Sequence, residues 1–105
     1  MANWHVSFTL TAEDDLERLD NGLQKRVIEK LNWLQNNFNN IIPMALTGEW
    51  QGFFKLRISD WRIIYQVEWD RNLIIVYIID RRDKIYKISS QFLDVLLLLF
   101  RARAL

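Results

Sequence analysis

Apolar and polar residues alternate over the first part of the chain. The apolar positions of this pattern are Trp4, Val6, Phe8 and Leu10. A period of two predicts a β-strand with one buried face. We therefore expect His5 to lie on the exposed face of this strand.

The spacing of apolar residues changes to three and four after this strand. Residues with this spacing are Leu16, Leu19, Leu23, Val27, Leu31, Leu34 and Phe38. Thr11 followed by Asp14 is typical of a helix N-terminus, and Gly22 is expected to divide the segment into helices of about ten and about sixteen residues. The pattern predicts a helical hairpin whose apolar stripe covers a sheet.

Three segments rich in β-branched and aromatic residues follow, at residues 53–58, 61–68 and 73–79. They are separated by connections at residues 59–60 and 70–72, which are short enough to require antiparallel hairpins. The predicted fold class is α+β, in the order β-α-α-β-β-β, with the helical hairpin packed on an antiparallel sheet.

The final segment, residues 89–105, is predicted to form an additional C-terminal helix that is apolar almost all round. Such a helix requires cover on more than one side. A partner protein could cover it, a second copy of the chain could do so in a homo-oligomer, or the isolated chain could be insoluble. We favour contact with a partner, because extended exposed apolar surfaces mark interaction sites.

Composition narrows the functional classes. The chain has 105 residues, of which 50% are hydrophobic and 26% charged, as in a single folded domain. It contains no cysteine and a single histidine, which excludes cysteine nucleophiles and Cys- or His-based metal clusters. The N-terminus lacks a signal-peptide pattern, and no stretch reaches the roughly 18 apolar residues of a membrane span. We expect a cytoplasmic protein with no membrane contact.

Positive charge is concentrated in the middle of the chain. The formal net charge is only +1, yet residues 55–87 hold 8 basic and 5 acidic side chains, against 4 basic and 7 acidic in residues 1–54. Charge asymmetry of this kind can mark a phosphate-binding face, although a solvated surface also produces it.

The densest candidate site lies on the strands of this basic segment. Lys55 and Arg57 are two residues apart and share one strand face, and Arg62 follows across a tight hairpin. These three cations are predicted to converge on one patch suited to phosphate. The alternative is an ordinary strand whose polar face is solvated.

Four motifs in this region together resemble a known family. They are Thr-Gly-Glu-Trp-Gln-Gly at 47–52, Lys-Leu-Arg at 55–57, Asp-Trp-Arg-Ile-Ile-Tyr at 60–65 and Arg-Asp-Lys-Ile-Tyr at 82–86. Their order and spacing resemble the RelE/ParE superfamily of bacterial toxins. The resemblance covers about residues 3–87, so residues 1–87 are interpreted as the toxin domain and 88–105 as its C-terminal helical extension. It implies the toxin of a type II toxin–antitoxin system, held inactive by a cognate antitoxin, and the tail could then occupy the groove of an antitoxin helix.

The resemblance implies one of two targets. RelE-like members cut mRNA in the ribosomal A site without metal, whereas ParE-like members inhibit DNA gyrase. The expected function is a ribosome-dependent mRNA endonuclease, a metal-independent endoribonuclease with no cofactor, whose partners are the antitoxin, the ribosome and mRNA. A ParE-like gyrase inhibitor and a degenerate toxin that acts only as a binding module stay open.

Matching positions within the family motifs assign the expected site residues. The residues expected in catalysis are Lys55, Arg57, Arg62, Arg82 and Tyr86. The residues expected to bind RNA are Lys55, Arg57, Arg62, Arg81 and Arg82. Many relatives carry a His-Arg pair where this chain has Arg81-Arg82, which leaves Lys55 and Tyr86 as the candidates for proton transfer.

Overall fold

The computed structural model describes residues 3–81 of the chain. Its main elements are β1 (His5–Phe8), α1 (Leu10–Glu17), α2 (Asn21–Asn37), β2 (Met44–Ala45), β3 (Phe54–Ile58), β4 (Trp61–Glu68) and β5 (Leu73–Arg81). Short 3₁₀ helices occupy Phe38–Asn40, Gly48–Trp50 and Trp69–Arg71. The predicted Arg82, Tyr86 and C-terminal helix lie outside the described residues.

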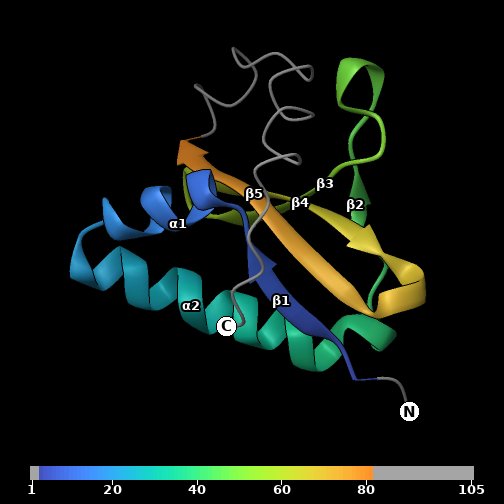
Figure 1. Cartoon of the computed structure of the whole chain (residues 1–105). Helices are drawn as coiled ribbons and strands as arrows, with labels where there is room; N and C mark the ends of the chain where they lie inside the picture. Colours follow the sequence, from blue (N-terminus) through green and yellow to red (C-terminus); the bar gives the residue numbers. More distant parts are fainter. Residues whose placement is uncertain (1–2, 82–105) are drawn as a thin grey trace.

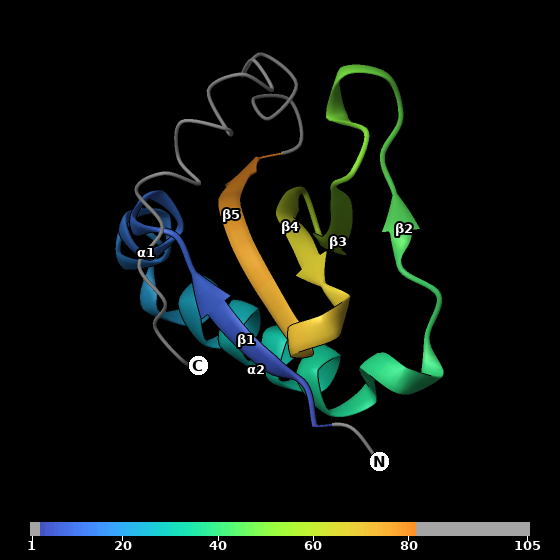
Figure 2. The ribbon, with the colours of Figure 1, turned by 45° about the vertical axis from the view of Figure 1, so that its right-hand side comes forward.

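The strands form one mixed sheet in the order β1-β5-β4-β3-β2. The strands β3, β4 and β5 pair antiparallel in succession, as the short connections predict. β2 also pairs antiparallel with β3, whereas β1 pairs with β5 in parallel. Figures 1 and 2 show α1 and α2 on the same side of this sheet. The α+β fold class is confirmed, but the sheet is not wholly antiparallel, because β5 returns beside β1 in the same direction.

Both faces of the sheet carry buried side chains. The main hydrophobic cluster lies between the sheet and the helices, with Val6, Leu31 and Ile63 fully buried within it. A second cluster on the opposite face includes Phe53 and Ile64. This double burial accounts for the nearly continuous apolar run of β5, whose residues 73–79 are all buried.

The helices begin and divide at different residues from those predicted. Thr9, not Thr11, is the N-cap of α1, because its hydroxyl accepts a hydrogen bond from the Ala12 N–H at 3.1 Å. Asp20 caps α2 by accepting from the Leu23 N–H at 2.8 Å. Gly22 lies inside the first turn of α2 and does not separate the helices.

The strand bounds agree closely with the pattern, with a few local departures. Leu10 was expected on the first strand but begins α1, where it is 39% exposed. The two-residue β2 was not predicted. Two residues other than glycine adopt a left-handed backbone conformation, Ser59 (φ 50°) in the turn between β3 and β4 and Asn72 (φ 51°) before β5.

Between Ile64 and Tyr65 the register of β4 against β5 shifts, which leaves one extra residue on β5. Tyr77 and Ile78 consequently both belong to the cluster on the face opposite the helices. Within residues 3–81, none of the helices is long and apolar enough to cross a membrane.

Candidate functional site: a basic face and an adjoining groove

Lys55, Arg57 and Arg62 lie on the sheet face opposite the helices. Leu56 and Ile58 of β3 pack with the helix-side cluster, so the alternation of side chains along a strand places Lys55 and Arg57 on the other face. Arg57 is directly opposite Arg62 of β4 in the antiparallel register, and directly opposed residues share a face. The structure therefore brings together the three cations that the sequence pattern grouped. We call these three residues the basic face.

These cations differ in how firmly the protein holds them. Arg62 is only 6% exposed, whereas Arg57 is exposed and Lys55 is half-buried. Arg57 donates a hydrogen bond from Nε to the backbone carbonyl of Ser59 at 3.2 Å. Asp80 of β5 lies opposite Arg62, which places a carboxylate on the same face. The basic face thus has a buried arginine at its centre and two more accessible cations beside it on β3.

Arg81 lies apart from the basic face. Its register partner is Trp61, which packs against the helix-side cluster, so Arg81 is at the end of β5 on the helix side of the sheet. Its backbone N–H donates to the Asp80 side chain at 2.7 Å. The structure therefore does not bring Arg81 together with Lys55, Arg57 and Arg62, and a role of Arg81 in RNA binding stays a prediction.

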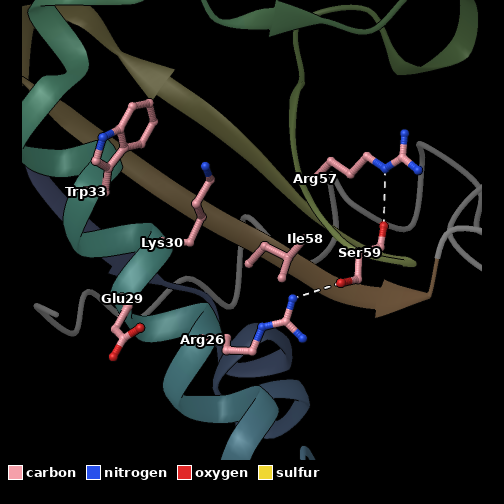
Figure 3. A pocket seen from close by; sticks show the side chains of 7 residues that line it. All are labelled: Arg26, Glu29, Lys30, Trp33, Arg57, Ile58 and Ser59. Carbon is pink, nitrogen blue, oxygen red and sulfur yellow. Dashed lines mark hydrogen bonds between the residues drawn. The ribbon is translucent and has the colours of Figure 1, made fainter.

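A second group of cations, missed in the sequence, belongs to α2. Arg26 and Lys30 line a groove of about 490 Å³ together with Trp33 of the same helix and with Arg57 and Ser59. Figure 3 shows Ser59 between two arginines, its hydroxyl accepting from Arg26 at 2.8 Å and its carbonyl accepting from Arg57. The Lys30 ammonium lies 4.5 Å from the centre of the Trp33 ring.

The spacing of these α2 residues was a usable signal. Positions 26, 30 and 33 are four and three residues apart, which puts their side chains on one face of a helix. The sequence could not reveal that this face borders the edge of β3, because that depends on the packing of α2 against the sheet.

The carboxyl group of Asp15, which contacts β5 near the end of the strand, has a raised pKa. Asp15 of α1 accepts a hydrogen bond from the backbone N–H of Ile79 at 3.0 Å. Burial raises the pKa of Asp15 from 3.8 to about 6; the bond from Ile79 opposes this effect and the nearby Asp80 adds to it. The site joins α1 to the strand that carries Asp80.

Tyr65 is a core residue, as expected. It is 1% exposed, and its ring stacks on Phe54 with centroids 5.6 Å apart. Burial raises the pKa of Tyr65 to about 12, so its phenol stays protonated at neutral pH. In residues 3–81, no group of three or more histidine, aspartate or glutamate side chains is arranged to hold a metal ion.

Solved structures of toxin–antitoxin proteins have a similar fold. The RelBE2 toxin–antitoxin complex from Mycobacterium tuberculosis matches with a TM-score of 0.68 and 24% identity, covering 77% of this chain and 100% of the other. The isolated RelE toxin of E. coli gives 0.63 and 20%, covering 82% and 93%. A YoeB/ParE toxin from Agrobacterium tumefaciens gives 0.62 and 19%, covering 73% and 96%. At these identities the likeness concerns the fold.

The sequence itself establishes the family. None of the curated proteins matches this chain. Residues 6–85, however, match the family model described as the ParE toxin of the parDE type II toxin–antitoxin system. This match spans most of the chain and includes β1, both helices and the basic face. The chain therefore belongs to the RelE/ParE superfamily and is the toxin of a type II toxin–antitoxin system.

Proposed function

We propose that this toxin blocks translation by cutting mRNA bound to the ribosome, as a metal-independent endoribonuclease without a cofactor. The observation that carries the proposal is the basic face, on which Arg57 and Arg62 are in direct register and Lys55 is two residues away. RNA phosphates are anionic, and guanidinium groups bind them through paired donors. The proposed partners are mRNA, the ribosome and a cognate antitoxin, which places the toxin in the cytoplasm.

In the proposed reaction the 2′-oxygen of the RNA attacks the adjacent phosphorus while a base removes its proton. The bond from phosphorus to the 5′-oxygen then breaks, and that oxygen takes up a proton. Negative charge accumulates on the phosphate oxygens in between, so fixed cations lower the barrier. Arg62 suits this role because its burial restricts its motion, while Arg57 and Lys55 can follow the RNA backbone.

Proton transfer is assigned to Lys55 and Tyr86 in this proposal, and phosphate binding also to Arg82. Lys55 is half-buried on β3 and lies on the same face as Arg62. Tyr86 and Arg82 follow β5 in the sequence. Near the end of β5, Asp80 pairs with Arg62 of β4.

The proposal is tested by inducing the toxin in bacteria without antitoxin and following the incorporation of labelled amino acid and labelled thymidine. We expect amino-acid incorporation to fall first, and Arg62→Ala to relieve the fall at least about tenfold, because removing one preorganised donor typically costs that much or more. Arg71→Ala is the matched control, because Arg71 is an exposed arginine away from the basic face that forms an ion pair with nearby Glu68 at 2.8 Å.

Because Arg62 is buried, its removal could unfold the protein. Circular dichroism of purified Arg62→Ala tests whether the variant is folded. A folded variant that remains fully toxic and still cuts ribosome-bound mRNA contradicts the assignment of the basic face.

The match to the ParE family model favours a second candidate, inhibition of DNA gyrase. In that case the basic face binds protein or DNA and performs no cleavage. Thymidine incorporation would then fall first while translation continues and mRNA stays intact, so the same experiment separates the two targets.

A further inference from the structure

Two side chains bind the backbone of β5 where β1 no longer accompanies it. β1 pairs with β5 only as far as Val76. Beyond that residue, the Thr9 hydroxyl donates to the carbonyl of Tyr77 at 3.1 Å, and the Asp15 carboxylate of α1 accepts the Ile79 N–H at 3.0 Å. Backbone groups of β5 that a longer β1 would have bound are thus bound by side chains instead.

The end of β5 is set apart from the rest of the strand by the irregular register. Tyr77 is the extra residue between Val76 and Ile78, whose partners in β4 are adjacent, and an extra residue interrupts the ladder of backbone hydrogen bonds. Among the strands within residues 3–81, only β4 pairs with residues 78–81. On the other side of this short segment, Asp15 binds the strand from α1.

The segment that Asp15 holds lies beside the centre of the basic face. Ile79, whose N–H Asp15 accepts, is followed by Asp80, the register partner of the buried Arg62. The sequence then continues into Arg82, which the proposed function assigns to phosphate binding. The position of this strand end therefore bears on the groups that surround the reacting phosphate.

A carboxylate is a costly acceptor for the Ile79 N–H. Asp15 is half-buried, and burial raises its pKa to about 6, which shows that its charged form is disfavoured there. An uncharged amide oxygen could accept the same N–H without this cost. A charged oxygen, however, forms a shorter and stronger hydrogen bond. Asp15 thus holds the end of β5 more firmly at the expense of stability, a trade that is typical of functional sites.

We propose that Asp15 is a positioning residue for the cleavage of mRNA, which fixes the end of β5 beside Arg62 by binding the Ile79 N–H. It acts through the strand and does not contact the RNA. A displacement of about 1 Å in a catalytic site costs on the order of 100-fold in rate. Because β4 still holds the other side of the segment, we expect a smaller effect, about tenfold. The inference rests on the proposed function, since cleavage is the reaction that the positioned groups perform.

The test measures cleavage of ribosome-bound mRNA by the purified full-length toxin. We expect Asp15→Ala to lower kcat about tenfold and to leave KM within about twofold, because the cations of β3 still bind RNA. Asp15→Asn keeps an oxygen that can accept the Ile79 N–H and is expected to restore kcat to within about threefold of the wild type. Asp14→Ala is the matched control, since Asp14 is an exposed aspartate next to Asp15 on α1. Its kcat should equal that of the wild type.

Nuclear magnetic resonance of the toxin labelled with ¹⁵N reports on positioning without cleavage. In Asp15→Ala we expect the Ile79 amide to exchange with solvent at least about tenfold faster, because the bond that protects it is gone. The side-chain Nε–H signal of Arg62 should shift in the same variant. Asp14→Ala should leave both signals unchanged, and thermal unfolding of each variant shows whether a fall in kcat merely follows a loss of stability.

The outcomes separate this inference from the proposed function. A wild-type toxin that cuts no ribosome-bound mRNA overturns the proposed function and this inference with it. A wild type that cuts mRNA, with an Asp15→Ala variant that cuts it equally fast, overturns only the role of Asp15. The same conclusion follows if Asp15→Ala leaves the Arg62 signal in place, or if Asp15→Asn is impaired as much as Asp15→Ala.

Discussion

The protonation state of Asp15 affects the stability of the contact between α1 and β5. Its carboxylate accepts the Ile79 N–H, and its pKa of about 6 lies above the usual value of 3.8. The folded protein therefore binds this proton more tightly than the unfolded chain. The resulting stabilisation is complete below about pH 4 and is lost as the pH rises through about 6.

We expect Asp15→Asn to raise the melting temperature near neutral pH by a few degrees, because it removes a partly buried charge and an amide oxygen can still accept the Ile79 N–H. The difference from the wild type should vanish below about pH 4, where the wild-type carboxyl is also neutral. Thermal unfolding across this pH range is the measurement. If the melting temperatures of Asp15→Asn and the wild type differed by the same amount at every pH, the charge of Asp15 would not be the cause of the difference.

Single residues also show the limit of inference from sequence. Lys55, Arg57 and Arg62 could be grouped in advance, because alternation along a strand and a two-residue turn determine which face they share. The burial of Arg62 could not be predicted from the sequence, because it depends on the packing of the whole sheet. The face on which Arg81 lies could not be predicted either, because the irregular register of β4 against β5 changes which residues share a face along β5.

At the scale of elements, α1 begins at Thr9 because of a contact across the fold. The Thr9 hydroxyl accepts from the Ala12 N–H and donates to the backbone carbonyl of Tyr77 at 3.1 Å. Thr9 is fully buried. A local pattern offers Thr11 equally well as a cap, and only the presence of β5 decides between the two residues.

Replacing Thr9 by valine keeps the shape of the side chain but removes both hydrogen bonds. We expect a loss of about 2–4 kcal/mol in the free energy of unfolding, from the lost cap and the lost buried hydrogen bond to the carbonyl of Tyr77. Thr9→Ser keeps the hydroxyl and should lose clearly less. Urea unfolding of both variants is the measurement, and equal losses would assign the effect to the methyl group.

Strand length explains why most elements were predictable and β2 was not. β4 and β5 are long runs of β-branched and aromatic residues, whereas β2 has two residues, both exposed, next to a proline. Its pairing with β3 is set by the loop that follows, where Leu46 and Phe53 are joined by a backbone hydrogen bond. No periodic signal can arise from so short a strand.

At the scale of the whole molecule, burial is distributed unevenly across the sheet. β5 pairs on both sides and is buried from Leu73 to Ile79, while β2 pairs on one side and is exposed. We expect amide hydrogen exchange to be slowest in β5 and β4 and fastest in β2, by several orders of magnitude, because exchange follows the free energy of local opening. Exchange measured by NMR tests this order, and slow exchange in β2 would contradict it.

The parallel pairing of β1 with β5 joins residues from the two ends of the described chain, His5 with Leu73. During synthesis β1 is made first, yet its partner β5 is the last to be made of the strands within residues 3–81. The sheet therefore cannot be completed on a partial chain, and a truncated product that ends before β5 lacks both the neighbour of β1 and the carboxylate opposite Arg62. An interrupted synthesis of this toxin should thus release a harmless fragment.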